Sequence, residues 1–558
     1  MRAAEFTNYE TGELTLNHWA RGSCKFGVLP ANGLLYKPQD PCTCYLQGKL
    51  LGFYALAPEA EREAGSVKRL PAEALAKEGE AEERLEKGPA YGKTPQSAIR
   101  NPQSQDWPAY RNNSQRTGAV ATKINPKLKK LWEVGITGRL TQPVIAGGKV
   151  YVCSVDEHTL YVLDEKTGAK LWTYTAGGRI DTPPTIYGGQ RTEDRGQRTE
   201  DRGQRTEDRG QKVGTGSLCL FGSRNGWVYC LRASDGELVW RFRAAPRERH
   251  VMAEGQVESA WPLHGSVIVA KGVVYCVAGR SAFLDGGVHL YALDAATGKV
   301  LEQSVINETQ ELDSGTAKTM PKETIGATSD ILVSDGDNIY MQQRKMNFSH
   351  GLPLGLEKRS RARLVVKSSF LDGFYFHRTA WSSHRAFGNL ISIDDNFTVA
   401  AAQLPAGGML SGQQVYVPGG GDISGNLGHT DTKHMKEDKF EEEQAKVKKY
   451  VVYGGYNIKA AKNTRMVWEL DKFPVCPYGL VLTDNAVCIA GFFDEVDPKD
   501  PWANVEGRKG GKLTILSRED GAMLSEYDLD SPPVWDGMSA ANGKLFMSLK
   551  NGKVVCFE

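Results

Sequence analysis

The chain has 558 residues, of which 40% are hydrophobic and 24% are charged, and its formal net charge is +2. A net charge so close to zero gives no long-range electrostatic attraction to nucleic acid or to an acidic partner. The sequence has no run of about 18 apolar residues, so it predicts no membrane span. Acidic residues interrupt any apolar core near the N-terminus, so no signal peptide is visible. The chain is therefore expected to be either cytosolic or the continuation of a longer one.

Residues 1–57 are predicted to form part of a repeat unit, because residues 48–57 (GKLLGFYALA) resemble residues 287–294 (GVHLYALD). We interpret them as the end of a unit whose earlier strands are missing, or as the remnant of a preceding domain. Three cysteines here fit a local disulfide or free thiols better than a zinc site, since C-x-C with one lone upstream cysteine is not zinc-ligand spacing: Cys24, Cys42 and Cys44.

Residues 58–105 are rich in Glu, Ala, Lys and Pro and are predicted to be a charged linker. Within them, residues 71–87 (PAEALAKEGEAEERLEK) have the composition of a solvated helix, with proline in the first turn and Gly88-Pro89 after it.

Residues 106–558 are built from a recurring unit. Its clearest copy is LYVLDEKTGAKLW at residues 160–172, and related copies start at Val228, Leu290 and Leu513. Each unit contains four short segments of alternating hydrophobicity separated by Gly, Asp and Asn turns, which is typical of an antiparallel meander. Such a repeat cannot bury its own apolar faces, so the sequence predicts an all-β propeller of four-stranded blades.

We count eight blades, with seven as the alternative. The last unit supplies only three strands, and we expect the segment LKKLWEV at residues 128–134 to complete it and so remove the exposed edges of an open ring. Two charged insertions interrupt the repeats, at residues 189–211, which hold three copies of GQRTEDR, and at residues 429–449. Neither has the apolar spacing of a coiled coil, and we interpret both as solvated insertions.

The unit ALDxxTGxxxW resembles the pyrroloquinoline-quinone-like (PQQ-like) propeller repeat, a family that includes quinoprotein alcohol dehydrogenases and the assembly factor BamB. The resemblance covers residues 106–558 and implies that a tryptophan at the end of each outermost strand packs against a glycine of the next blade. Glu302 and Ser525 replace it in two units, and it is present in four: Trp132, Trp172, Trp240 and Trp468. The opening DWPAYRNNSQRTG is similar to that of exported bacterial propellers, which implies a periplasmic or cell-envelope location.

The dehydrogenases of this family hold PQQ between an indole and a disulfide of adjacent cysteines, with a calcium ion and an aspartate base. No two cysteines are adjacent here and no carboxylate pair stands out, so we expect no PQQ, no calcium and no metal site. Cys230, Cys276, Cys488 and Cys556 occupy repeat positions where sister units have Val or Ala, and are expected to be small core residues. His377 and His384 are the one close histidine pair with aromatic neighbours, Phe376 and Trp381, and we interpret them as surface or channel residues because no third ligand accompanies them.

The segments that enter the innermost strands are expected to meet at one end of a central channel. Together with a nearby loop that carries Arg280, they supply charged groups and indoles that could bind a polar ligand or a peptide. The alternative is that they are capping turns, because GRLTQP and GRIDTPP are near copies of each other. We call these eight the mouth residues: Arg139, Arg179, Asp181, Glu258, Trp261, Arg280, Trp535 and Asp536.

These patterns predict a non-catalytic scaffold that binds protein partners, as the resemblance to BamB implies. Two alternatives stay open: a PQQ-dependent alcohol dehydrogenase, and a propeller module that binds a ligand within a larger protein. Motifs of serine hydrolases, zinc proteases and P-loop enzymes are absent from the sequence.

Overall fold

The computed structural model contains β-strands and turns, with no helix in the part of the chain that it describes. That part comprises residues 4–12, 14–17, 20, 27–38, 53–57, 83–93, 105–188, 217–253, 255–264, 267–307, 327–342, 344–349, 364–367, 379–383, 386–403, 414–417, 420–424, 456–462, 465–495, 497 and 499–558. Both predicted insertions and the residues His377, His384, Cys24, Cys42 and Cys44 lie outside it.

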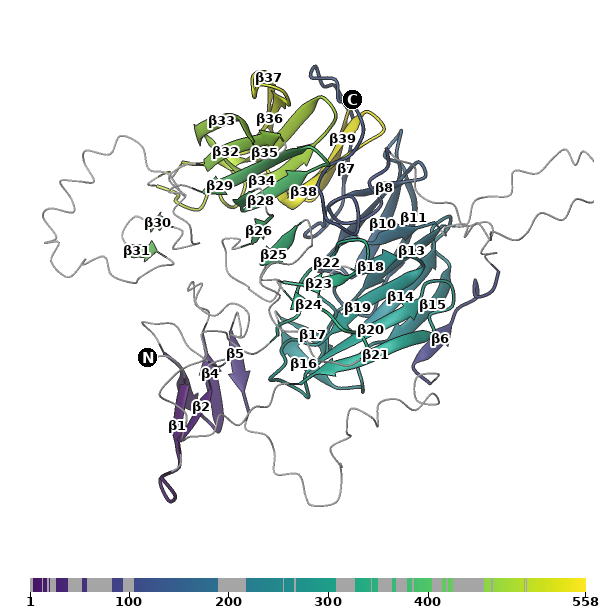
Figure 1. Ribbon diagram of the computed structural model, residues 1–558, viewed down its shortest axis with the longest axis vertical. Coiled ribbons are helices and arrows are strands. Elements are labelled where there is room, and N and C mark those ends of the chain that lie inside the picture. The colour runs from purple at the N-terminus through teal and green to yellow at the C-terminus, as the bar shows by residue number, and fades with distance from the viewer. Residues whose placement is uncertain are drawn as a thin grey trace, which may run out of the picture.

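The N-terminal strands stand apart from the other sheets (Figure 1). β1 (Ala4–Thr7) pairs with β2 (Leu14–Asn17), and a second antiparallel sheet joins β3 (Leu29–Ala31), β4 (Leu34–Lys37) and β5 (Tyr54–Leu56). β5 lies within the stretch whose sequence resembles a repeat strand. That residues 1–57 are part of a blade stays a prediction.

Four antiparallel sheets have the predicted four strands in sequence order, from the innermost to the outermost, and one of them gains a fifth. The first contains β8 (Val144–Ala146), β9 (Lys149–Ser154), β10 (Thr159–Asp164) and β11 (Lys170–Thr175). The second contains β12 (Thr185–Tyr187), β13 (Leu218–Gly222), β14 (Trp227–Arg232) and β15 (Leu238–Arg243). The third contains β18 (Ile268–Ala270), β19 (Val273–Ala278), β20 (Val288–Asp294) and β21 (Val300–Ile306). The fourth contains β34 (Val475–Leu482), β35 (Ala486–Phe493), β36 (Gly511–Ser517) and β37 (Met523–Leu529).

The remaining sheets depart from this plan. One has four strands with a long connection inside it: β28 (Leu390–Ile393), β29 (Phe397–Gln403), β32 (Tyr456–Lys462) and β33 (Arg465–Phe473). Two have three: β22 (Leu332–Ser334), β23 (Ile339–Met341) and β24 (Arg344–Lys345), then β25 (Val365–Lys367), β26 (Ala380–Ser382) and β27 (Phe387–Gly388). Two hairpins stand alone: β16 (His250–Ala253) with β17 (Gln256–Ser259), and β30 (Gln414–Val417) with β31 (Gly420–Ser424). The eight-bladed count stays a prediction.

The last sheet joins the two ends of the repeat region. β38 (Pro533–Ala541), β39 (Lys544–Leu549) and β40 (Lys553–Phe557) are followed by β7 (Lys130–Gly135), and Cys556 pairs with Trp132 across the closing ladder. Innermost strands of successive sheets also touch, including β34 with β38 and β38 with β8. The predicted closure by the segment at residues 128–134 is thus confirmed.

The predicted linker contributes a strand. β6 (Leu85–Lys87) pairs antiparallel with β15 as the fifth strand of the second sheet. The helix predicted over residues 71–87 is therefore wrong for its described end, residues 83–87. Backbone pairing along an open sheet edge outweighs the helical propensity of this Glu- and Lys-rich sequence.

The repeated turn explains the repeated sequence. The carboxylate of Asp164 accepts hydrogen bonds from the backbone N–H (2.9 Å) and the hydroxyl (2.8 Å) of Thr167, and these bonds lower its pKa. Asp294 and Thr297 make the same pair of bonds in the third sheet. The glycine that follows has a positive φ, +72° at Gly168, which other residues rarely adopt.

Each of the four predicted tryptophans lies against such a glycine. A Cβ added to the glycine would lie between 2.5 and 2.8 Å from the ring: Trp132 on Gly168, Trp172 on Gly236, Trp240 on Gly298 and Trp468 on Gly521. Three of the rings also donate their indole N–H to a carbonyl of the next blade, on Glu165, Ala295 and Arg518. In β37, Ser525 replaces tryptophan and donates to the carbonyl of Pro126 instead.

The described cysteines are all buried and none forms a disulfide: Cys153, Cys219, Cys230, Cys276, Cys476, Cys488 and Cys556. Burial raises the pKa of each thiol, to about 12 for Cys276, Cys488 and Cys556. They occupy the core as small apolar residues, as the sequence predicted.

Candidate functional site

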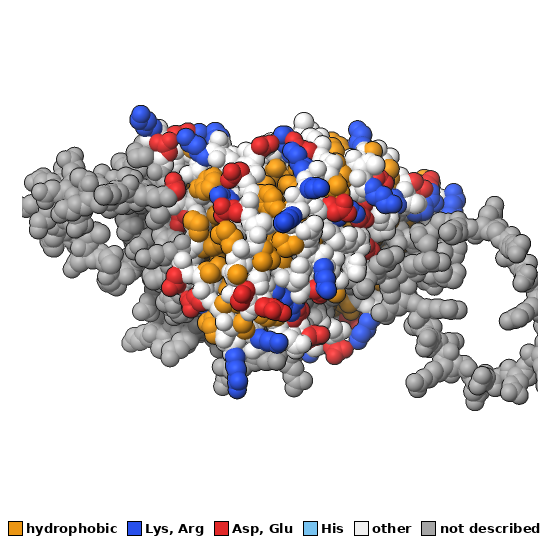
Figure 2. Space-filling view, turned by 90° about the horizontal axis from the view of Figure 1, so that it is seen from above, with side chains coloured by type: hydrophobic (Ala, Val, Ile, Leu, Met, Phe, Trp, Pro, Cys, Tyr) orange, Lys and Arg blue, Asp and Glu red, His pale blue; other side chains and the backbone are white. Residues whose placement is uncertain are grey.

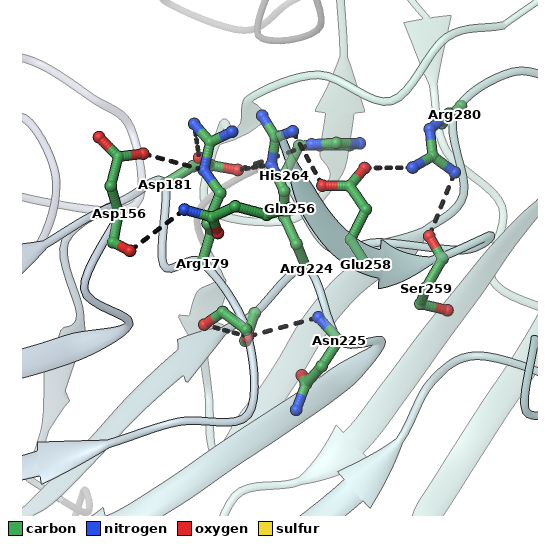
Figure 3. Close-up of polar contacts among 12 residues, drawn as sticks. Asp156, Arg179, Asp181, Arg224, Asn225, Gln256, Glu258, Ser259, His264 and Arg280 are labelled. Carbon is green, nitrogen blue, oxygen red and sulfur yellow. Dashed lines mark hydrogen bonds and ion pairs between the residues drawn. The ribbon is translucent and has the colours of Figure 1, made fainter. Parts of the chain in front are cut away.

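Six charged side chains from the first three units form a continuous series that we call the charge chain (Figure 3). Its members come from connections on the same side of successive sheets, and charges of opposite sign alternate along it. In order they are Asp156, Arg179, Asp181, Arg224, Glu258 and Arg280.

Every link of the chain is an ion pair. Arg179 Nε lies 3.3 Å from the Asp156 carboxylate, and its Nη2 lies 3.4 Å from that of Asp181. Arg224 Nε donates to the other oxygen of Asp181, while its Nη1 lies 3.1 Å from Glu258. Arg280 Nη2 donates to the second oxygen of Glu258.

Two positions of the repeat supply five of the six residues. Asp156, Arg224 and Arg280 occupy the same place in the turn after the second strand of consecutive units. Arg179 and Glu258 lie four residues before a proline in the segment leading to the next innermost strand. Two backbone bonds hold these segments together: Arg224 N–H donates to the Arg179 carbonyl (2.9 Å), and Ser259 N–H to that of Arg224 (2.8 Å).

The chain is electrically balanced, with three acids and three arginines, and all but Asp156 are buried. Burial alone would raise the pKa of Asp181, but Arg224, His264 and Arg179 hold it well below its usual range. Burial, reinforced by Arg224, lowers the pKa of His264 to about 4, so this histidine is neutral at pH 7. Its Nδ1 lies 3.7 Å from Asp181.

The mouth residues are not all in this chain. Arg139 is exposed and lies 3.5 Å from Asp156 at the open end. Trp261 is buried, and its indole N–H donates to the carbonyl of Asp285 at 2.9 Å. Trp535 packs in a hydrophobic cluster against Tyr478, with ring centroids 5.1 Å apart.

Asp536 belongs to a second buried cluster. Its carboxylate accepts Arg111 Nη1 at 2.5 Å and the Tyr110 hydroxyl at 2.6 Å. The Arg111 guanidinium lies 4.4 Å from the ring centroid of Trp381. Burial, with Asp536 nearby, raises the pKa of Tyr110 well above its ordinary value.

Sequence reasoning missed Arg224, His264, Arg111 and Tyr110. Arg224 had a detectable signal, because it stands where the preceding unit has Asp156, and charge inversion at one repeat position suggests pairing between units. Arg111 and Tyr110 carried no such signal, since they precede the first strand of the repeats and their partner Asp536 is more than 400 residues away.

These side chains do not fit a PQQ–calcium site. A calcium ion needs several free carboxylate or carbonyl oxygens, whereas Asp181, Glu258 and Asp536 already accept arginine N–H groups. Among the residues that the structure describes, no three His, Cys, Asp or Glu side chains are grouped to hold a metal ion. The arrangement can brace three adjacent blades, and at its exposed end it offers one arginine and one carboxylate.

Comparison with known proteins agrees with the fold. The family model described as outer membrane protein assembly factor BamB matches residues 115–203 and 203–350. No curated protein matches the chain in sequence.

Solved structures to which the chain is similar include BamB from Moraxella catarrhalis, at 11% identity and a TM-score of 0.39, over 77% of this chain and 97% of that one. They also include the quinohemoprotein alcohol dehydrogenase from Comamonas testosteroni, at 13% identity and a TM-score of 0.42, over 86% of this chain and 84% of that one. The family-model match over the first units, together with the four-stranded antiparallel sheets, supports a PQQ-like repeat β-propeller.

Proposed function

We propose that this protein is a non-catalytic scaffold of the cell envelope that binds protein partners at the outer rim of its propeller. One observation carries the proposal. The residue just before the tryptophan position of the outermost strand is apolar and between 41% and 54% exposed in five units: Leu131, Leu171, Leu301, Val467 and Leu524. Apolar side chains that recur at one exposed position favour a contact surface over chance exposure.

The charge chain supports a scaffold rather than an enzyme. Its buried acids and arginines are paired with one another, so they stabilise adjacent blades instead of presenting a free base or a cation site. The name of the matching family model, an outer membrane protein assembly factor, supports both the envelope location and a partner that is a protein.

A polar ligand or peptide at the mouth is the second candidate. Arg139 and Asp156 favour it, because they are the exposed end of an otherwise buried series of charges. A short charged ligand would compete with their ion pair, which is long at 3.5 Å and contributes little at this exposure.

Site-specific photo-crosslinking in the source cells tests the proposal. A photoreactive amino acid at Leu524 of the full chain should give discrete adducts with other proteins. The same amino acid at Asp337, which is highly exposed in the turn between β22 and β23, serves as the control. Adducts absent from Leu524, Val467 and Leu131 alike would contradict a rim-binding scaffold.

A further inference from the structure

The strand β6 shows how an extended segment binds to the outer rim. It pairs antiparallel with β15, and the backbone N–H groups of Gly88 and Ala90 continue the contact by donating to the carbonyls of Val239 (2.9 Å) and Leu238 (3.0 Å). Val239 occupies the repeat position of the five exposed apolar residues, yet it is only 2% exposed. The added strand is what distinguishes this blade from the others.

Side chains of the β6 segment match those of β15. Glu86 lies opposite Arg241, and their carboxylate and guanidinium are 2.6 Å apart. Leu85 lies opposite Phe242 and packs beside Trp240. Recognition therefore combines backbone pairing, one apolar contact and one pair of opposite charges.

Three other outermost strands offer the same edge with the opposite charge. β33, β37 and β7 each pair on one side only within the described residues. At the repeat position that Arg241 occupies in β15, these strands carry Glu469, Glu526 and Glu133. The strands belong to consecutive sheets, and Figure 2 looks onto the end of the molecule where β33 and β37 lie, with apolar side chains gathered between charged ones.

β37 is the middle strand of the three and has the most acidic edge. Met523 and Leu524 are both exposed. Glu526 and Asp528 share a single amine, that of Lys512, at 2.7 and 3.6 Å, and Asp528 is 88% exposed. One lysine between two carboxylates leaves a net negative charge for a guest strand to neutralise.

We propose that the edge of β37 binds an extended segment of a partner protein in which basic and apolar side chains alternate. This inference rests on the proposed rim-binding function. The segment runs antiparallel to β37. A lysine or arginine lies opposite Glu526, an apolar side chain lies opposite Tyr527, and the following residues cover Met523 and Leu524.

Peptides copied from the β6 segment test this directly. The first probe is a fluorescent peptide of residues 83–93 with Glu86→Lys, and the matched control is the same peptide with Glu86 retained. In fluorescence anisotropy with the full chain, the Glu86→Lys peptide should bind saturably and roughly tenfold more tightly than the control, since one attractive charge pair replaces a repulsive one.

Exchange of the charge on the protein locates the binding. In the variant Glu526→Lys the preference should reverse in favour of the Glu86 peptide, whereas Glu519→Lys, in the exposed turn before β37, should leave both affinities unchanged. Equal binding of both peptides would overturn the charge selection, and a preference that survives Glu526→Lys would overturn the assignment to β37. No binding of either peptide would overturn strand addition, while photo-crosslinking from Leu524 would still report on the scaffold function independently.

Discussion

Glu258 is the residue whose neutralisation should reveal what the charge chain does. It is buried, and each of its carboxylate oxygens accepts an N–H group from a different arginine, Arg224 or Arg280. The substitution Glu258→Gln keeps the shape of the side chain but removes the negative charge that balances two buried guanidinium groups. Removing one partner of a buried ion pair costs about 3–5 kcal/mol. We expect a loss at the low end of this range, about 3 kcal/mol, because each arginine retains other partners. Arg224 still pairs with Asp181, and Arg280 still donates to the carbonyls of Ser259 and Ala260.

Urea unfolding followed by tryptophan fluorescence at pH 7 measures this loss as a lower midpoint. Glu526→Gln is the matched control, because Glu526 pairs with Lys512 at the surface, where removing an ion pair costs at most about 1 kcal/mol. A midpoint for Glu258→Gln no lower than that of the control would refute the conclusion that the charge chain braces the blades.

Three further predictions concern stability. Trp240→Ala should destabilise the protein by about 3–5 kcal/mol in urea unfolding, since the buried ring fills the space against Gly298; an unchanged midpoint would contradict its docking role. Burial lowers the pKa of His264 to about 4 and that of His289 to about 3, so the unfolded state binds more protons below pH 6.5. The free energy of unfolding should therefore keep its full value above pH 6.5 and fall as the pH drops from 6.5 through 4, by up to about 3 kcal/mol for His264. In the variant His264→Asn, the melting temperature should fall less over this pH range. Deletion of β40 should lower the melting temperature and promote aggregation, because it exposes the edges of β39 and β7; a monomer of unchanged melting temperature would show that closure is dispensable.

The repeat made most of the fold predictable. Alternating apolar residues, the Asp-x-x-Thr-Gly turn and the tryptophan that follows it are local signals, and they predicted the four-stranded sheets. The closing pair of β7 and β40 was also predictable, because a unit with three strands requires a fourth from elsewhere. β6 was not, since its residues Leu85, Glu86 and Lys87 have no strand periodicity and are extended only because β15 offers an edge.

Only part of the candidate site could be predicted residue by residue, and its arrangement could not. Four of the mouth residues, Arg179, Asp181, Glu258 and Arg280, do meet, because adjacent units place their connections together. Asp536 pairs with Arg111 instead, and a contact between residues so far apart in sequence leaves no trace in local pattern.

Thermal unfolding of the full chain during titration with PQQ and Ca²⁺ tests the absence of a catalytic cofactor site most directly. A ligand that binds only the folded state raises the melting temperature with its concentration. A scaffold whose buried acids are already paired with arginines should show no change well above micromolar PQQ. A saturable rise that requires both PQQ and Ca²⁺ would contradict this and restore the dehydrogenase interpretation.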